Sequence, residues 1–336
     1  MHQLRKPYLL YLGASKDKMF AKTAFGLRDW CRADCLGEWS LPEATVTTGL
    51  ERLSPAEAAK RGAGSIVIGI APVGGALPPE WIPDLEAAIE AGLDVVSGMH
   101  TRLTSFPTLL AAAAKHGVRL IDVRHADKRF PAGSGRKRTG MRVATVGTDC
   151  ALGKKYTALT IARALNARGV KATFRATGQT GIMIAGEGVA IDAVVSDFVA
   201  GAAEQLSPDN DADHWDVIEG QGALFHPAYA AVTLGLLHGS QPDALVLCHD
   251  PSRMFIEDFP GFPIPDLRVA IRRYEEAAHL TNAKAKVVAV SINSSAMDDA
   301  AWKAYADATS RHVGLPVLDP MRGGADGLAA AVLTVG

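Results

Sequence analysis

The chain has 336 residues, of which 48% are apolar and 21% are charged, and its formal net charge is −1. This length suffices for two domains of ordinary size in a folded globular protein. The balanced charge does not favour a polyanionic partner such as nucleic acid.

Cysteine usage and the N-terminal sequence indicate the compartment. The four cysteines form neither a zinc-binding spacing nor a dense disulfide framework, which is typical of a reducing environment. The apolar run at 8–12 is too short for a signal peptide or a membrane span, and it predicts a first strand. We therefore expect a cytoplasmic protein with a small-molecule substrate, without nucleic-acid or membrane partners, for which homo-oligomer formation stays open.

Short apolar runs alternate with helical patterns over the first part of the chain, which predicts a parallel sheet with crossover helices. The expected elements lie at 8–12, 65–70, 79–91, 93–97, 106–116 and 118–123. No G-x-G-x-x-G motif follows the first strand, so the sequence does not support a dinucleotide site there. Breakers and basic residues concentrate at 131–140, and we place the boundary between domains 1–135 and 136–336 in this segment.

The second part predicts five strands that are mostly continuous apolar runs, as expected for a parallel sheet covered on both faces. They lie at 142–146, 172–176, 215–218, 244–248 and 286–291. A polar or glycine-rich motif accompanies the end of each strand, in order at 147–155, 177–181, 219–222, 249–250 and 293. Because ligands of open α/β sheets bind outside the carboxyl ends of the strands, these motifs predict one shared site.

The loop at 147–155 joins a strand to a helical pattern at 156–168, which predicts a phosphate cradle. Backbone N–H groups of such a loop point at an anion, and a lysine adds charge. The spacing departs from G-x-x-x-x-G-K-[ST] by one residue, and Lys155 stands where a magnesium-binding Ser or Thr is usual. The residues expected at the cradle are Gly147, Thr148, Asp149, Cys150, Gly153, Lys154, Lys155, Tyr156 and Thr157.

Lys155 bears on what the loop holds. An NTPase needs Mg²⁺ at the loop hydroxyl to neutralise phosphate charge, whereas Lys155 offers a cation and no oxygen ligand. Thr157 points elsewhere, because two residues correspond to roughly 200° around a helix. The loop is therefore predicted to anchor a pyrophosphate without a metal, and a solvated helix lysine is the alternative for Lys155.

Cys150 lies inside the loop. A helix N-terminus and two lysines can acidify a thiol, which would allow a covalent acyl-enzyme. The sequence supplies no adjacent histidine as a base, so a small residue that fills the loop is the favoured interpretation.

Four residues are candidates for a general base or for direct contact with the ligand. Glu219 follows the third strand of the second part, and His226 comes shortly afterwards, on what we expect to be the same loop. A helix predicted at 190–204 carries Asp192 and Asp197, which lie about 140° apart and cannot both face one ligand. Each also has a structural alternative. Glu219 could belong to an ordinary polar turn, His226 could be a structural histidine, and Asp192 could be a helix N-cap.

Long stretches of the chain resemble a P-loop family described as of unknown function, to which D-glutamate N-acetyltransferases belong. They are residues 122–125, 146–158, 176–185, 218–227, 234–243 and 317–322, and the resemblance covers essentially the whole chain. It implies a Rossmann-like N-terminal domain, a P-loop C-terminal domain, and acetyl-CoA as the acyl donor. The activity that it implies is N-acetylation of an acidic amino acid, D-glutamate above all, in D-amino-acid catabolism.

The resemblance also implies a function for each candidate residue. The loop would hold the cofactor diphosphate, Gln179 would lie near the thioester, and Asn293 would read the adenine through its amide. The base would be one of Glu219, His226, Asp192 and Asp197. Gln221 or glycine-turn amides would stabilise the oxyanion. Substrate carboxylates would pair with first-domain cations, namely Lys22, Arg28, His100 and Arg102.

A more distant resemblance is to dethiobiotin synthetase, which shares the Gly-Thr-Asp start of the loop, the Ile-Glu-Gly turn and a late asparagine at a strand end. In that enzyme the loop binds ATP and a threonine follows the lysine, whereas this chain has Lys155. The alternatives are therefore an ATP- and Mg²⁺-dependent ligase or kinase, and a nucleotide-switched P-loop binding protein without turnover.

Overall fold

The computed structural model describes residues 2–70, 75–125 and 129–335. The chain divides into two compact units: an N-terminal unit of Met1–Lys128 and Gly178–Ala193, and a P-loop unit of Arg129–Thr177 and Val194–Gly336. This division falls shortly before the segment 131–140 in which the sequence places the boundary. It also assigns the segment Gly178–Ala193 to the N-terminal unit, although this segment lies within the second half of the sequence.

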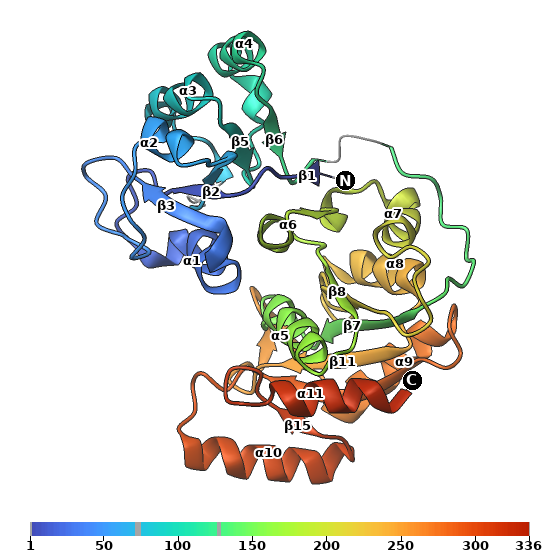
Figure 1. Ribbon diagram of the computed structural model, residues 1–336. Helices are drawn as coiled ribbons and strands as arrows, with labels where there is room; N and C mark the ends of the chain where they lie inside the picture. The colour runs from blue at the N-terminus through green and yellow to red at the C-terminus, as the bar shows by residue number, and fades with distance from the viewer. Residues whose placement is uncertain (1, 71–74, 126–128, 336) are drawn as a thin grey trace. The chain divides into compact units, whose positions relative to one another are not determined.

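The described part of the N-terminal unit contains a five-stranded parallel sheet in the order β3-β2-β4-β5-β6 (Figure 1). The strands are β2 (Tyr8–Tyr11), β3 (Cys35–Trp39), β4 (Ser65–Ile68), β5 (Asp94–Ser97) and β6 (Leu120–Asp122). The helices are α1 (Lys22–Trp30), α2 (Pro55–Lys60), α3 (Ile82–Glu90) and α4 (Pro107–His116). Every residue of β2, β4 and β5 is buried, as expected of strands covered on both faces. The predicted parallel sheet with crossover helices is confirmed.

The segment Gly178–Ala193 packs on this unit through α6 (Gln179–Ala185) and β9 (Glu187–Gly188). β9 pairs antiparallel with β1 (His2–Gln3), and the N–H of Leu4 donates to the carbonyl of Gly186 at 2.8 Å. Thr180 of α6 lies in hydrogen-bond contact with Thr23 of α1 at 3.3 Å. These contacts fasten a segment from the middle of the chain to its N-terminal end.

The helix predicted at 190–204 is wrong. Two short 3₁₀ turns, η6 (Ile191–Ala193) and η7 (Ser196–Phe198), precede α7 (Val199–Leu206). Val195 between the turns has φ −56° and ψ 135°, an extended conformation that suits a β-branched residue and interrupts a helix. Asp192 and Asp197 therefore belong to separate turns, in the N-terminal unit and the P-loop unit respectively.

The described part of the P-loop unit contains a six-stranded parallel sheet in the order β15-β14-β11-β7-β10-β8. The strands are β7 (Met141–Gly147), β8 (Ala172–Arg175), β10 (Trp215–Ile218), β11 (Ala244–His249), β14 (Lys286–Ile292) and β15 (Val317–Leu318). The further helices are α5 (Lys154–Ala167), α8 (Ala230–Ser240), α9 (Leu267–His279), α10 (Asp299–Val313) and α11 (Ala325–Val332). The five predicted strands are confirmed, and the short β15 adds an edge strand.

Helices cover both faces of this sheet. In Figure 1, α5 and α11 lie on one face, and α7, α8 and α9 lie on the other. Val143 and Ile161 are fully buried where α5 packs on β7, and Val246 and Leu328 extend the same core. Because all six strands are parallel, their carboxyl ends meet at one edge, and the polar motifs that follow them gather there.

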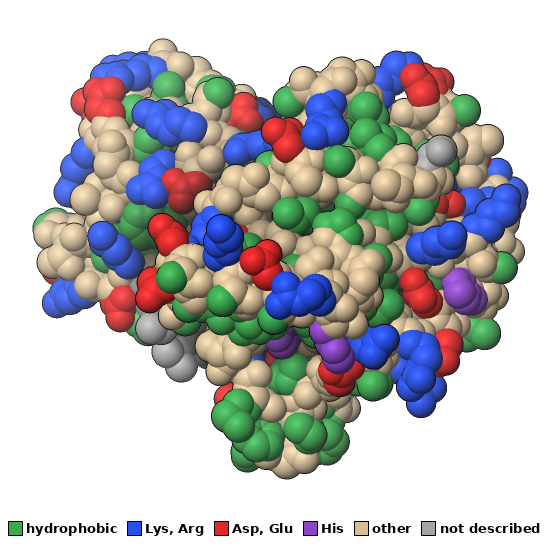
Figure 2. Space-filling model, turned by 90° about the horizontal axis from the view of Figure 1, so that it is seen from below, with side chains coloured by type: hydrophobic (Ala, Val, Ile, Leu, Met, Phe, Trp, Pro, Cys, Tyr) green, Lys and Arg blue, Asp and Glu red, His purple; other side chains and the backbone are tan. Residues whose placement is uncertain are grey.

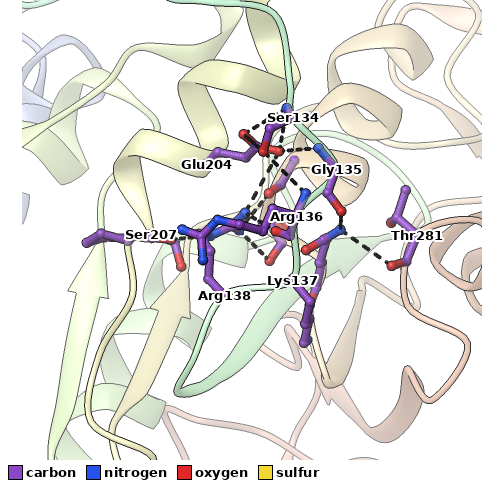
Figure 3. Close-up of polar contacts among 12 residues, drawn as sticks. Ser134, Gly135, Arg136, Lys137, Arg138, Glu204, Ser207 and Thr281 are labelled. Atoms are coloured by element: carbon purple, nitrogen blue, oxygen red, sulfur yellow. Dashed lines mark hydrogen bonds and ion pairs between the residues drawn. The ribbon is translucent and has the colours of Figure 1, made fainter.

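The segment rich in breakers and basic residues is bound firmly to the P-loop unit (Figure 3). The Glu204 carboxylate accepts hydrogen bonds from the N–H groups of Ser134 (2.9 Å) and Gly135 (2.8 Å). The Arg138 guanidinium donates to the carbonyls of Ser207 (2.6 Å) and Gly239 (2.7 Å), and burial lowers the pKa of Arg138 to about 10. This segment is therefore an ordered part of the P-loop unit from residue 129 onward.

The surface carries mixed charge. On the face shown in Figure 2, Lys and Arg side chains are interspersed with Asp and Glu, in keeping with the formal net charge of −1. Among the described helices, none combines the length and the apolar character needed to cross a lipid bilayer.

The crossing of α7 and α8 yields a test of the fold. A Cβ at Gly239 would lie 2.1 Å from the carbonyl oxygen of Ala200, so Gly239→Ala must push the two helices apart. We expect it to lower the free energy of unfolding by about 1–3 kcal/mol, although alanine favours an isolated helix by about 1 kcal/mol. Urea unfolding followed by circular dichroism measures this. Gly261→Ala on β13 (Phe259–Pro263) is the control, since its added Cβ would meet nothing within 4 Å; equal stability of the two variants would contradict the packing described.

Candidate active site at the phosphate loop

The loop between β7 and α5 has the geometry of an anion cradle. Ala151 (φ 52°) and Gly153 (φ 98°) adopt left-handed conformations, which are uncommon for alanine and concentrate at functional sites. No side chain caps the N-terminus of α5, so the N–H groups of its first turn lack an intrahelical partner. A Cβ at Gly147 would lie 2.8 Å from the carbonyl oxygen of Asp149. The backbone thus leaves donors at a helix start, where an anion is stabilised.

Lys154 is held inside the loop. Its Nζ donates to the carbonyl oxygen of Asp149 at 2.8 Å, and its side chain is almost wholly buried. Burial lowers the pKa of Lys154 below that of an ordinary lysine. This ammonium is buried against a carbonyl oxygen, which favours the binding of an anion, because the anion would offset the cost of desolvating the charge.

Asp149 organises the loop rather than facing a ligand. It is fully buried. One oxygen accepts the N–H of Cys150 (2.6 Å), and the other accepts the Arg253 guanidinium (2.7 Å) and the N–H of Glu257 (2.9 Å). Arg253 precedes β12 (Phe255–Ile256), and Glu257 lies in the turn between β12 and β13. This tie between the loop and the hairpin was not predicted from the sequence, because its partners lie 104 and 108 positions apart.

The carboxyl end of β10 is bound to the end of β8. Glu219 accepts the N–H of Thr177 at 2.9 Å, and the Thr177 hydroxyl donates to the carbonyl of Glu219 at 2.6 Å. The Gln221 amide donates to the same hydroxyl at 3.2 Å. Burial lowers the pKa of Lys155, and the charge of Glu219 partly opposes this shift.

Gly220 allows the β10 end to approach the loop strand. A Cβ at this position would lie 1.8 Å from the carbonyl oxygen of Thr145 and 3.0 Å from Lys154 Cδ. The N–H of Gly220 donates to the Thr145 hydroxyl at 2.9 Å. The Glu-Gly-Gln-Gly motif therefore lies directly against the loop, as its place after a neighbouring strand predicts.

His226 lies beside the loop as well, and its proximity to Cys150 was not predicted from the sequence. A ring nitrogen of His226, the Cys150 sulfur and a carboxylate oxygen of Asp149 lie within 4.8 Å of one another. His226 Nδ1 accepts the N–H of Ala228 at 3.1 Å. Its buried ring packs against Tyr229 and Phe259, with centroids 4.5 and 5.1 Å away.

The structure agrees with the favoured interpretation of Cys150 as a residue that fills the loop, and it does not favour the alternative of an acidified thiol. Burial raises the pKa of the Cys150 thiol above its ordinary value, and the charge of Lys154 opposes that shift only in part. Cys150, Asp149 and His226 also form the one group of three possible metal ligands found among the described residues. Both Asp149 oxygens already accept hydrogen bonds, one of them from Arg253, so this carboxylate is engaged within the protein.

Other predicted residues of the site are occupied by partners within the P-loop unit. The Asn293 amide donates to Asp250 at 3.0 Å, and the Thr157 hydroxyl meets that of Ser291 at 2.8 Å in the interior. The second contact confirms that Thr157 points away from the loop. Thr148 contacts His249 Nδ1 at 2.9 Å, and burial lowers the pKa of His249 to about 4. Lys155 Nζ lies 4.7 Å from the ring centroid of Tyr156.

The expected substrate cations and two further candidates belong to the N-terminal unit. Lys22 begins α1, and His100 and Arg102 are exposed after β5. Gln179 packs near Gly98 at the end of β5. Asp192 pairs with Arg124 at 3.2 Å. Asp197, the remaining carboxylate, is exposed on the P-loop unit.

Comparison with known proteins identifies the family. Residues 129–329 match the P-loop domain of unknown function DUF1611, and residues 39–126 match the Rossmann-like domain DUF1611_N. The chain belongs to the DUF1611 family. A crystal structure of a DUF1611 family protein from Anabaena variabilis is similar to it with a TM-score of 0.84 and 35% identity, over 98% of this chain and 99% of that one.

Two relatives of this chain are named D-glutamate N-acetyltransferase. The relative from a Pseudoalteromonas species is 46% identical over 98% of this chain and 99% of its own length. The relative from Tritonibacter scottomollicae is 45% identical over 99% of this chain and 100% of its own length. Relatedness over the full length supports the N-acetyltransferase class of enzyme for this chain.

The Asp149–Arg253 contact predicts how the loop of this DUF1611 protein is stabilised. Asp149→Asn removes the buried charge of the pair and leaves Arg253 with only the half-exposed carboxylate of Glu257, 3.3 Å away. We expect a loss of about 3 kcal/mol or more in the free energy of unfolding, measured by urea unfolding. Glu276→Gln, which breaks a surface pair with Arg273, should cost about 1 kcal/mol or less. A loss for Asp149→Asn as small as this control would show that the loop does not depend on the pair.

Proposed function

We propose that this protein transfers the acetyl group of acetyl-CoA to the amino group of an acidic amino acid, D-glutamate above all, in D-amino-acid catabolism. The names of the two full-length relatives support the reaction and the substrate. The phosphate loop supports the cofactor, because coenzyme A carries a diphosphate that such a loop can bind.

The single observation that carries the cofactor assignment is Lys155, which follows Lys154 in the first turn of α5, where a metal-binding Ser or Thr is usual. In a nucleotide-hydrolysing loop, a hydroxyl and a carboxylate in this region provide oxygen ligands for Mg²⁺. Here Glu219 already holds Thr177, and its charge acts on the ammonium of Lys155. A loop with two lysines suits a diphosphate that is bound as an anchor and is not cleaved.

The residues that would hold the cofactor follow from this geometry. N–H groups of the loop and of the first turn of α5, with Lys154 and Lys155, would bind the diphosphate. Acetyl-CoA supplies an activated acetyl thioester. The substrate ammonium must lose a proton before its nitrogen can react, and Glu219, His226, Asp192 and Asp197 are the candidates for accepting it. Lys22, His100 and Arg102 are the proposed partners of the substrate carboxylates.

The assay is direct. Purified protein is incubated with acetyl-CoA and D-glutamate in the presence of EDTA, and free coenzyme A is followed with a thiol reagent. We expect release of coenzyme A and formation of N-acetyl-D-glutamate without added metal, and slower turnover of L-glutamate. If the protein instead releases phosphate from ATP only with Mg²⁺, and leaves acetyl-CoA intact, it is a ligase or kinase and the proposal is wrong.

Replacing Lys155 tests the metal-free cradle. Lys155→Thr removes the ammonium and supplies the hydroxyl that binds Mg²⁺ in nucleotide-hydrolysing loops, so ADP binding should become stronger when Mg²⁺ is added. Lys155→Met is the matched control, because it removes the charge without adding an oxygen ligand, and we expect it to weaken binding with and without Mg²⁺. Titration calorimetry of ADP with each protein measures both effects. Mg²⁺-dependent ADP binding by the unchanged protein would contradict the role given to Lys155.

A further inference from the structure

His226 is fixed at the phosphate loop by contacts on several sides. The hydroxyl of Tyr274 on α9 donates to the carbonyl of Gly147 at 2.7 Å and accepts the N–H of Leu224 at 2.9 Å. It therefore joins the end of the loop strand to the turn that carries His226. The N–H of His226 donates to the carbonyl of Ala223 at 3.0 Å, and aromatic rings enclose its imidazole. The imidazole is thus held against the loop in one position.

The hydrogen bond from Ala228 determines what this imidazole can do. Nδ1 accepts a backbone N–H, and a backbone N–H cannot act as an acceptor in turn. A neutral imidazole in this contact must therefore carry its proton on Nε2. A histidine in this form donates a hydrogen bond through Nε2. It cannot take a proton there, or coordinate a metal through Nε2, unless the contact with Ala228 breaks.

The phosphate loop is the place where an Nε2–H donor of His226 could bind an anion. The imidazole lies close to Cys150 inside the loop, and Lys154 and the uncapped start of α5 belong to the same loop. An N–H donor at this position adds to the groups that stabilise an anion. In coenzyme A, the whole pantetheine arm separates the thioester from the diphosphate, so a residue at the loop is remote from the transferred acetyl group.

We infer that His226 binds the cofactor diphosphate as a hydrogen-bond donor through Nε2 and is not the base of the reaction. The inference rests on the proposed function, since it takes coenzyme A as the ligand of the loop. It removes His226 from the four candidate bases, and because Glu219 also lies beside the loop, the same distance from the thioester counts against Glu219 and leaves Asp192 and Asp197. In this role, the packing of Tyr229 and Phe259 against the His226 ring orients its Nε2–H group.

Binding measurements test this role without turnover. We propose titration calorimetry of ADP and of coenzyme A, without Mg²⁺, against the unchanged protein and the variants His226→Ala, His226→Asn and His226→Gln. Glutamine carries an amide N–H at about the reach of Nε2, whereas asparagine is too short. We expect Kd to rise about tenfold for His226→Ala and His226→Asn, and to stay within about threefold of the original value for His226→Gln. Thermal unfolding of each variant shows whether it is folded.

Kinetics with acetyl-CoA and D-glutamate then separate binding from proton transfer. A diphosphate donor predicts a higher KM for acetyl-CoA in His226→Ala with kcat within about twofold. A base predicts a fall of kcat by about a hundredfold or more and an unchanged Kd, and this result would overturn the inference. An unchanged Kd for every variant would overturn it as well. If the unchanged protein binds coenzyme A and ADP but transfers no acetyl group, the reaction proposed above fails while the binding role of His226 is still decided by calorimetry.

Discussion

The pairing of β10 with β7 is the constraint on which the site depends. These strands are neighbours in register, with Ile218 opposite Ala144, so the segments that follow them must share the space at the carboxyl edge of the sheet. Gly220 makes the approach possible because any side chain there would enter the backbone of Thr145. The consequence is that Glu219 and His226 lie beside the phosphate loop, although at least sixty positions of sequence separate them from it.

The loop is supported by polar contacts that are satisfied inside the protein. Asp149 is surrounded by donors from its own loop and from the β12–β13 hairpin, and Tyr274 holds the loop strand and the His226 turn together. Lys154 differs from these groups, because its ammonium is buried against a carbonyl oxygen and not against a carboxylate. The supporting residues are neutralised within the fold, while positive charge is left at the cradle. This distribution favours an anionic ligand.

The strands of the sheets could be predicted from the sequence, whereas most side-chain contacts of the site could not. The strands of the P-loop unit were recognised because burial on both faces makes them continuous apolar runs, as in Ala244–Cys248. β3 was missed because it contains Glu38, whose charge is accommodated by the N–H of Thr48 (2.7 Å) and a threonine hydroxyl. The helix predicted at 190–204 failed at Val195, where the backbone turns extended. Local patterns do not report such contacts, and the same reason explains why Arg253 was not identified and why Cys150 was not connected with His226.

The segment Gly178–Ala193 has a consequence for how the two halves can be produced. It leaves the P-loop unit after Thr177, contributes α6 and β9 to the N-terminal unit, and returns at Val194. A polypeptide that stops at Lys128 would lack these elements, so β1 would have no strand to pair with. A polypeptide that starts at Arg129 would carry the apolar side chains of Ile182 and Met183, which are fully buried in the intact chain, without the surface that receives them. The two units therefore alternate along the sequence. To produce the P-loop unit alone, the segment Gly178–Ala193 would have to be replaced by a linker from Thr177 to Val194.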